Sequence, residues 1–534
     1  MLTTADEFDV VIAGAGFAGM YMLHSARKLG LRTRVFEKGP SVGGTWYWNR
    51  YPGLRCDVES IDYSYSFSDE IQQEWKWKDR YSTRDDIIKY ANFVADRLHL
   101  RDDIQFSSEI ESAAFDEEAK RWRISIACGA VVSAQFFIMA TGCLSSPKIP
   151  DIAGRDVFTG TLLHTTDWPA EGADFTGQRV GVIGTGSSGI QVIPIVAEQA
   201  EHLTVFQRTP SFSLPAHNAA ITAEDERLTK ANYRAHREAA RKSWGGIPYL
   251  FGSMTAAEMS PIERQHLMQR VYDRGAPFEF MSIFSDLIID EAANRIAFEF
   301  VAGKIRERVK DPKIAEELIP YGDYIGTRRI CIDTNYYETY NRNNVRLVNL
   351  KRTPIVSITE TGVHTSEDMV ALDTIIFATG YDAMTGSIFK VDIRGRGGLA
   401  LKDKWSNGPR LHLGLMTEGF PNLFFITGPL SPSVLSNVVV SIEQHVQWIT
   451  ECITYLRQRD RVHIEPTPQA EESWVSDCAN VAENTLVTKV NSWYMGSNIL
   501  GKPRIFQLYL GGVAAYRSLC DEAAANNYRG FVIS

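Results

Sequence analysis

Short apolar runs followed by glycine-rich turns open the chain. Residues 8–13 form an apolar run of strand length, and the turn at 14–19 leads into a segment from Met20 that we expect to be helical. A second apolar run at 33–36 ends at Glu37. Strand, glycine turn, helix and second strand in this order predict a βαβ unit, in which the two strands lie parallel.

The same order of elements recurs in the second quarter of the chain. An apolar run at 179–183 precedes another glycine-rich turn at 184–189, and a further run follows at 203–206. Two more apolar runs, at 135–142 and 373–380, both end in Ala-Thr-Gly. These units predict an α/β fold class, with two doubly wound dinucleotide-binding domains of the Rossmann type.

Each glycine turn has the dinucleotide pattern G-x-G-x-x-G, and one later residue distinguishes the two. The glycines permit the tight turn, the close approach of a pyrophosphate and the packing of the helix on its strand. At equivalent positions downstream, the first unit has Glu37, whereas the second has Gln207 followed by Arg208 and Thr209. A carboxylate accepts ribose hydroxyls and repels a 2′-phosphate, and a neutral glutamine beside an arginine does the opposite. We therefore interpret the first site as an FAD site and the second as an NADPH site.

Residues 215–325 carry no nucleotide signature. The segments 223–242 and 291–308 are charged and rich in residues of high helix propensity. We expect a helical insertion that helps to roof a substrate cavity. Further on, residues 421–428 predict a buried strand. The helix after it should bury one apolar face as core (Ile442, Val446, Ile449, Ile453 and Leu456).

Composition and charge disfavour several classes of partner. A chain of 534 residues with 44% hydrophobic and 23% charged residues is typical of soluble globular domains. The net charge of −9 disfavours nucleic acid and anionic membranes, and no apolar run is long enough to span a bilayer. The first residues lack the features of a signal peptide, and the seven cysteines show no C-x-x-C spacing. We expect a cytoplasmic protein without a metal site.

A flavin and NADPH together leave several reactions open. A dithiol–disulfide reductase needs a cysteine pair shortly after the first glycine turn, and Cys56 has no such partner. A reductase that passes electrons from NADPH to a carrier remains open. The third possibility is oxygen activation, followed by attack on a carbonyl or on a soft heteroatom.

Aromatic and charged positions favour oxygen activation. The segment 43–53 is dense in glycine and aromatic residues, which suits packing against an isoalloxazine ring. Asp57 follows it closely, and Arg328 and Arg329 stand side by side far downstream. Oxygen insertion creates negative charge that a fixed cation in a dry site stabilises, and arginine cannot lose its charge there. An aspartate such as Asp57 can hold that arginine in place.

Residues 158–169, FTGTLLHTTDWP, fit neither a helix nor a strand template, because their apolar positions have no steady period. Taken alone, His164 and Trp168 would be ordinary linker residues. Their spacing, F-x-G-x-x-x-H-x-x-x-W-P, resembles the fingerprint of Baeyer–Villiger monooxygenases, which are class B flavoprotein monooxygenases. Nearly the whole chain is similar to the phenylacetone and steroid type of this family, through GGTWYWNRYPG, RCDVES, GVIGTGSSGIQV, VFQRTP, DTNYYETYNR, FATGYDAMTG and SWYMGSNILGKPR.

The resemblance implies a role for each of several charged residues. Arg329 would be the catalytic arginine that stabilises a peroxyflavin and the following intermediate, and Asp57 would be its partner. His164 would couple the position of the linker to the nicotinamide site. Arg208 and Thr209 would hold the 2′-phosphate of NADPH together with Arg328, which stands where the family more often has lysine.

The remaining residues carried over by motif would line the two nucleotide sites, with Trp493 on the NADP and substrate side. The complete cofactor-binding set is Gly14, Gly16, Phe17, Gly19, Glu37, Lys38, Gly44, Thr45, Trp46, Trp48, Arg55, Cys56, Asp57, Tyr63, Gly184, Thr185, Gly186, Ser187, Ser188, Gly189, Gln191, Arg208, Thr209, Arg328, Arg329 and Trp493.

The resemblance also implies that the NADPH domain is inserted into the FAD domain, since the paired Ala-Thr-Gly endings are similar to the crossing points of such flavoproteins. The expected division is a first FAD part (1–145), a first NADPH part (146–214, with the linker 158–169), the helical insertion (215–325), a second NADPH part (326–380), and a second FAD part with the C-terminal region (381–534).

The implied reaction converts a ketone to an ester or lactone through a C4a-peroxyflavin, with consumption of NADPH and O2. The expected partners are therefore the ketone and O2, without nucleic acid, membrane or an obligate protein partner. Two alternatives stay open. One is a flavin monooxygenase that oxidises sulfides or amines, which usually has a shorter linker without Trp168-Pro169. The other is the NADPH–electron-carrier reductase.

Overall fold

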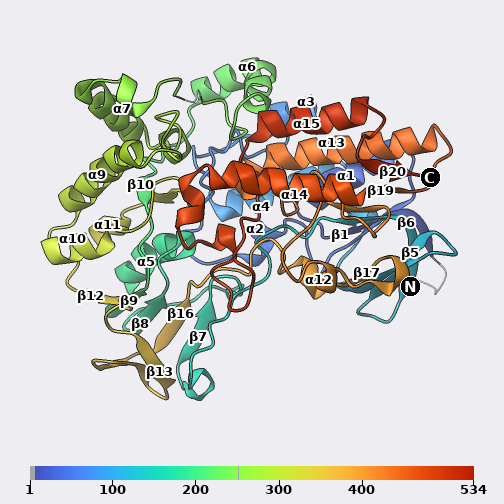
Figure 1. Cartoon of the computed structure of the whole chain (residues 1–534). Helices are drawn as coiled ribbons and strands as arrows, with labels where there is room; N and C mark the ends of the chain where they lie inside the picture. Colours follow the sequence, from blue (N-terminus) through green and yellow to red (C-terminus); the bar gives the residue numbers. More distant parts are fainter. Residues whose placement is uncertain (1–5, 250–251) are drawn as a thin grey trace.

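The computed structural model describes residues 6–249 and 252–534. Two sheets dominate the fold, and a group of helices projects on one side of them (Figure 1). None of the helices within the described ranges has both the length and the apolar character needed to cross a membrane.

The larger sheet takes its strands from both ends of the chain. Its order is β17-β4-β5-β6-β1-β2-β3, with β18 paired to β6. All pairs are parallel except β4–β5 and β5–β6, which form an antiparallel meander. The strands are β1 (Glu7–Ala13), β2 (Thr33–Phe36), β3 (Ile104–Gln105), β4 (Ile110–Asp116), β5 (Arg121–Ile126), β6 (Val131–Met139), β17 (Asp392–Arg394) and β18 (Leu423–Phe425).

The second sheet is entirely parallel and has the order β12-β9-β8-β16-β7. Its strands are β7 (Thr161–His164), β8 (Arg179–Ile183), β9 (His202–Gln207), β12 (Val345–Asn349) and β16 (Thr374–Phe377). From β8 the chain runs through helix α5 (Ser187–Gln199) to β9 on one side, and β16 lies on the other. The strand order therefore reverses between β8 and β16, and the carboxyl ends of strands at such a point are where nucleotides bind. A small antiparallel sheet adjoins it, formed by β13 (Ile355–Thr359), β14 (Gly362–Thr365) and β15 (Met369–Ala371).

Two local expectations from the sequence are wrong. The stretch 158–169 contains a strand, β7, which pairs with β16 at the edge of the second sheet. An edge strand has one neighbour, and only Leu163 of its four residues is buried, so no alternating pattern marks it. Helix α1 begins at Phe17 rather than at Met20 and ends at Lys28, because Gly19 already belongs to its first turn. A Cβ at Gly19 would lie 1.8 Å from the carbonyl oxygen of Gly14, so this helix can pack on its strand only through a glycine.

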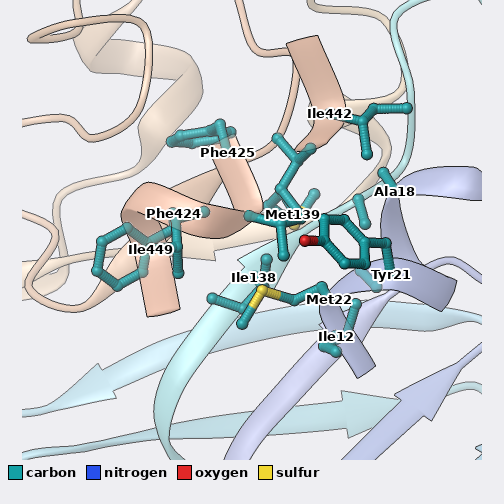
Figure 2. Close-up of a cluster of buried hydrophobic side chains, with 14 of the residues drawn as sticks. Ile12, Ala18, Tyr21, Met22, Ile138, Met139, Phe424, Phe425, Ile442 and Ile449 are labelled. Atoms are coloured by element: carbon teal, nitrogen blue, oxygen red, sulfur yellow. The ribbon is translucent and has the colours of Figure 1, made fainter. Parts of the chain in front are cut away.

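The core of the larger sheet lies beneath helices α1 and α13 (Val438–Arg457). Side chains of β1, β6 and β18 meet both helices there, among them Ile12, Ile138 and Phe424 (Figure 2). The apolar stripe expected on α13 is confirmed as core, since all its members are at most 5% exposed (Ile442, Val446, Ile449, Ile453 and Leu456).

The projecting helices occupy residues 223–318. Thr222 and Asp225 form a capping box at the start of the first, and Ser260 and Glu263 do the same for the second. The helices are α6 (Ala223–Arg241), α7 (Pro261–Arg274), α8 (Pro277–Phe280), α9 (Glu291–Arg308) and α10 (Pro312–Leu318), drawn in green and yellow-green in Figure 1. The short strands β10 (Ser213–Pro215) and β11 (Cys331–Asp333) pair with each other where the chain enters and leaves this region.

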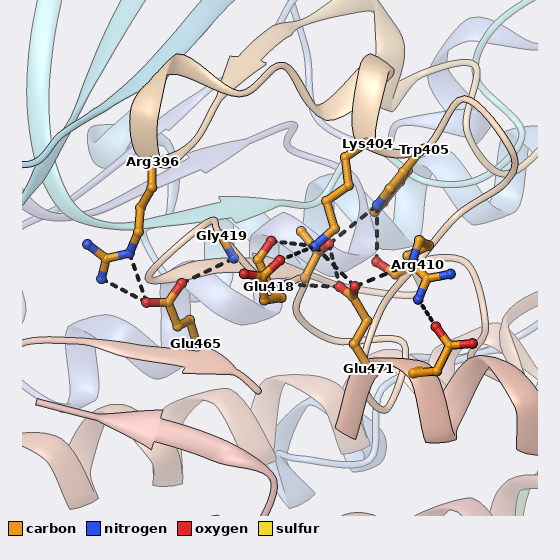
Figure 3. A network of polar contacts seen from close by, with 10 residues as sticks. Arg396, Lys404, Trp405, Arg410, Glu418, Gly419, Glu465 and Glu471 are labelled. Atoms are coloured by element: carbon orange, nitrogen blue, oxygen red, sulfur yellow. Dashed lines mark hydrogen bonds and ion pairs between the residues drawn. The ribbon is translucent and has the colours of Figure 1, made fainter. Parts of the chain in front are cut away.

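A network of ion pairs joins the C-terminal elements to one another (Figure 3). Lys404, at the end of α12 (Leu401–Lys404), pairs with Glu418 at 2.8 Å and with Glu471 on α14 (Pro468–Glu483) at 3.0 Å. The side chains of Lys404 and Glu471 are 9% and 4% exposed. These charges are buried but paired, which buried charges require. The remaining C-terminal elements are β19 (Ile464–Pro466), α15 (Val513–Ala525) and β20 (Phe531–Ile533).

Candidate active site

The first glycine turn forms a cradle at the carboxyl end of β1. A Cβ at Gly44 would lie 3.0 Å from the Cα of Gly16, so the absence of side chains lets these two backbone segments approach closely. Glu37 lies beside it at the end of β2, where its oxygens accept hydrogen bonds from the backbone N–H groups of Ala15 and Gly39, each at 2.7 Å. Burial raises the pKa of Glu37, and the two N–H groups oppose that rise. This combination of glycine backbone and fixed acid fits the pyrophosphate and ribose of a dinucleotide.

Aromatic side chains extend this cradle. Helix α2 (Thr45–Trp48) carries Trp46, whose indole Nε1 donates to the hydroxyl of Tyr63 at 3.0 Å. The ring of Tyr63 also lies 5.7 Å from that of Phe17, between centroids. An apolar wall of this kind suits a flavin ring. Lys38, by contrast, is half-exposed and pairs with Glu109 at 3.0 Å, so its charge already has a partner.

The second glycine turn lies at the carboxyl end of β8. A Cβ at Gly186 would meet nothing within 4 Å, so its backbone faces open space that a ligand can enter. Ser187 and Ser188 follow in the first turn of α5, whose N–H groups favour an anion. The hydroxyl of Thr185 donates to the carbonyl oxygen of Thr209 at 3.1 Å, which fixes the loop after β9. This site therefore fits a second dinucleotide.

Positive charge surrounds the loop after β9. Gln207 is buried, and its amide donates to the carbonyl oxygen of Glu317 at 2.8 Å. Arg208 is exposed and lines a surface cavity of about 770 Å³ together with Lys351 and Arg352. Arg328 forms an ion pair with Asp323. The structure thus presents several cations where the sequence predicts a 2′-phosphate.

Arg329 is held between segments that are distant in sequence. Its Nε lies 2.6 Å from one oxygen of Asp57, and its Nη2 donates to the other at 2.9 Å. Its Nη1 donates to the carbonyl oxygen of Val434 at 3.0 Å. The ring of Phe278, from α8, faces the guanidinium with the Cζ atom 4.2 Å from the ring centroid. Arg329 is therefore a fixed cation, with its side chain 22% exposed.

The loop that carries Asp57 is also attached to the second glycine turn. The side-chain amide of Gln191, on α5, donates to the carbonyl oxygen of Arg55 at 3.0 Å. The hydroxyl of Tyr51 donates to the oxygen of the same amide at 3.0 Å. Cys56 lies buried in this loop, and burial raises the pKa of its thiol. These contacts place the arginine–aspartate pair between the two nucleotide cradles.

His164, the last residue of β7, has polar neighbours at both ring nitrogens: Thr166 at Nδ1, and Lys148 and Thr379 at Nε2. Its Nδ1 accepts from the backbone N–H of Thr166 at 3.2 Å, so the proton of the neutral ring lies on Nε2. That Nε2–H donates to the carbonyl oxygen of Lys148 at 3.2 Å. Burial lowers the pKa of His164, which keeps the ring neutral. The histidine thereby ties β7 to the segment that precedes the second sheet.

We expect His164→Ala to lower the turnover number while FAD stays bound, because the variant loses the contact between β7 and Lys148 without touching the first cradle. Steady-state NADPH oxidation with substrate and the flavin absorbance of the purified protein measure the two quantities. His202→Ala is the control, since this histidine on β9 has a side chain that is 64% exposed. Equal turnover in both variants would leave His164 with a purely structural role.

Several residues at this site were not predicted from the sequence. Phe278 and Val434 contact Arg329, but neither stands in a glycine turn or a charged motif. Lys148 receives the hydrogen bond of His164, yet it stands in an inconspicuous Pro-Lys-Ile-Pro segment. Trp493, by contrast, was predicted; it opens the short helix η8 (Trp493–Met495) and packs against Tyr494, with ring centroids 4.2 Å apart. The one signal in the sequence that points to Lys148 is its place shortly after the first Ala-Thr-Gly ending, in the same loop.

Comparison with known proteins agrees with two nucleotide sites. Residues 11–229 match the family model described as pyridine nucleotide-disulphide oxidoreductase. Fold and match together define a two-dinucleotide oxidoreductase, although the chain has no cysteine pair after its first glycine turn. Acetone monooxygenase (methyl acetate-forming) of Gordonia sp. (strain TY-5) is 41% identical over 98% of this chain and 99% of its own length. Phenazine N-monooxygenase of Lysobacter antibioticus is 42% identical over 99% of this chain and 97% of its own length.

Solved structures extend the likeness to three dimensions. A steroid monooxygenase bound to NADP superimposes with a TM-score of 0.95 at 49% identity, over 99% of both chains. A complex of OTEMO with FAD and NADP gives a TM-score of 0.96 at 38% identity, again over 99% of both chains. The chain belongs to the Baeyer–Villiger monooxygenases, and its cofactors are FAD and NADP(H). The expected fold class and cofactors are thereby confirmed.

Proposed function

We propose that this chain converts ketones to esters or lactones: ketone + NADPH + O2 + H⁺ gives ester + NADP⁺ + water. The observation that carries the proposal is the Arg329 guanidinium, which Asp57 and the Val434 carbonyl fix between two nucleotide cradles. Such a preoriented cation stabilises negative charge as it develops on a carbonyl oxygen. A relative named as an acetone monooxygenase that forms methyl acetate supports this choice of reaction.

The residues divide into two binding sets in this proposal. Gly16, Gly44 and Glu37 would hold FAD, which when bound supplies hydride acceptance from NADPH and reaction with O2. Gly186 and Arg208 would hold NADPH at the second cradle, with Ser187, Ser188, Thr209 and Arg328 beside them. Asp57 orients Arg329, and the partly buried His164 holds β7 against the segment that contains Lys148.

The domain division proposed from the sequence also agrees with sheet membership. Strands of the first sheet come from residues 7–139 and 392–425, whereas those of the second come from residues 161–377. We take the FAD domain as discontinuous, with the NADPH domain and the helices of 223–318 inserted. Phe278 of α8 reaches Arg329, which supports a helical roof over the substrate site. The cytoplasm is the proposed location, with the ketone and O2 as the partners.

We expect a ketone panel incubated with NADPH and ¹⁸O2 to yield an ester or lactone that carries one ¹⁸O atom. The reason is that the inserted oxygen comes from O2 and the carbonyl oxygen of the ketone is retained. Mass spectrometry of the products measures the label. NADPH consumption without any labelled product, but with reduction of an added electron carrier, would replace the proposal by the electron-carrier reductase.

Heteroatom oxidation is a second candidate function. It is favoured by the 42% identity with an enzyme named as a phenazine N-monooxygenase. The panel therefore includes an aryl sulfide and a phenazine beside small, aromatic and steroid ketones. Since a steroid monooxygenase structure shares 49% identity, we propose bulky ketones as the preferred class. A labelled N-oxide or sulfoxide formed faster than any ester would favour the second candidate.

A further inference from the structure

Lys148 lies beside the end of β16, the strand paired with the one that precedes the second glycine turn, although no sequence motif marks it. Its backbone N–H donates to the carbonyl oxygen of Gly380 at 2.9 Å. Its own carbonyl oxygen accepts from the Thr379 hydroxyl at 2.7 Å and from the His164 ring at 3.2 Å. Thr379 and Gly380 directly follow β16, so three contacts fix Lys148 at the carboxyl edge of the second sheet. Nucleotides bind at that edge.

The ammonium group of Lys148 has no acidic partner among the described residues. Its Nζ donates to the backbone carbonyl oxygen of Asn498, and no ion pair joins it to a carboxylate there. The same holds for Arg208, whose guanidinium also forms no ion pair within those ranges, whereas neighbouring Arg328 and Arg352 pair with Asp323 and Glu317. Lys148 and Arg208 are thus two unneutralised cations beside one nucleotide site.

Both cations lie at the carboxyl edge of the second sheet, Lys148 beside the end of β16 and Arg208 directly after β9. Burial lowers the pKa of Lys148, and the positive charge of Arg208 lowers it further. Like charges kept close without a carboxylate between them destabilise the ligand-free protein, and an anion that lies between them removes this cost. The phosphate that distinguishes NADPH from NADH is such an anion, and it is the group expected beside Arg208.

We propose that Lys148 binds the 2′-phosphate of NADPH together with Arg208, and that through Asn498 it joins the C-terminal segment 491–505 to the coenzyme site. The proposal rests on the NADPH site proposed above. It adds a specificity-determining residue from a segment that lies outside the glycine turn and its following strand.

A second lysine provides a matched control. Lys502 contacts the same junction, because its Nζ donates to Asp382 and to the carbonyl oxygen of Ala383, each at 2.7 Å. Asn498 also donates to the carbonyl oxygen of Tyr381 at 2.8 Å. Both lysines therefore fasten segment 491–505, but Lys502 is already neutralised by a carboxylate. A purely structural role would make the two lysines equivalent.

The test is isothermal titration of the FAD-loaded protein with adenosine 2′,5′-bisphosphate and, separately, with adenosine 5′-monophosphate. Lys148→Met should weaken binding of the bisphosphate by about tenfold, as expected for a charge-assisted hydrogen bond, and binding of the monophosphate by less than about twofold. Lys148→Arg should restore most of the difference. Lys502→Met should change both affinities by the same factor.

Equal losses with both ligands in Lys148→Met, whether from a contact with the 5′-phosphate or from a loosened segment, would overturn the proposal. So would a Lys502→Met variant that also selects against the bisphosphate. Because the titration contains neither ketone nor O2, its outcome is independent of whether the chain oxidises ketones. If Lys148→Met shows the expected selectivity but no ¹⁸O-labelled ester forms, the proposed ketone oxidation is wrong and the role of Lys148 stands.

Discussion

Arg329→Ala is expected to lower ester formation by about 10²–10³-fold, the usual effect of removing one group that stabilises an oxyanion. Anaerobic reduction of the flavin by NADPH should continue and be affected less, since the oxyanion that this guanidinium is proposed to stabilise forms only after O2 has reacted. The structure supports the separation, because Asp57, the Val434 carbonyl and the Phe278 ring hold Arg329 on three sides. Product analysis and stopped-flow flavin absorbance measure the two steps.

Two further variants sharpen this test. Arg329→Lys should also fail to form ester, because a compact ammonium cannot contact both oxygens of Asp57 and donate to the Val434 carbonyl as the planar guanidinium does. Arg328→Ala is the matched control, since the neighbouring arginine pairs with Asp323 instead. It should weaken NADPH binding and leave ester formation at saturating NADPH nearly unchanged. Ester formation near the parental rate in Arg329→Ala would refute both the site and its proposed role.

Local patterns predicted the parts of the fold that depend on neighbours in sequence. The strands expected at 33–36 and 179–183 are β2 and β8 with the same bounds, and the helix expected at 291–308 is α9. Glycine spacing and short apolar runs determine such units, because each rule acts over a few residues. Strand β7 was missed for the same reason, since an edge strand in contact with one neighbour needs only Leu163 to be buried.

Within the site, only residues that belong to a recognisable sequence motif were predicted. Asp57 and Arg329 were paired through family resemblance, and the structure brings them together across the chain. Phe278 and the carbonyl of Val434 also contact that arginine. A backbone oxygen exists at every residue, and a phenylalanine can pack in many environments, so neither contact can be predicted from the sequence. The role proposed for Lys148 likewise depends on its neighbours Arg208 and Asn498, which are distant in sequence. Contacts between distant segments depend on the assembled fold, which no local pattern encodes.

Arg208→Ala is expected to raise the Michaelis constant for NADPH far more than that for NADH, by about 1.5–3 kcal/mol of binding free energy, the value of a charge-assisted hydrogen bond. The neutral Gln207 cannot replace the lost charge, because its side chain is buried and its amide already donates to Glu317. Arg208 itself is exposed at the rim of a cavity, so its removal should not disturb the core. Initial rates with each coenzyme, at fixed ketone and ionic strength, measure the difference.

Arg352→Ala is the matched control for this experiment. Arg352 lines the same cavity, but it forms an ion pair with Glu317 and its side chain is 66% exposed. If the cavity attracts NADPH only through its general positive charge, both variants should lose a similar, salt-sensitive fraction of affinity. If Arg208 contacts the 2′-phosphate directly, Arg208→Ala alone should lose the preference for NADPH and retain its rate with NADH. Equal losses with both coenzymes in Arg208→Ala would assign this arginine to a part of the coenzyme that NADPH and NADH share.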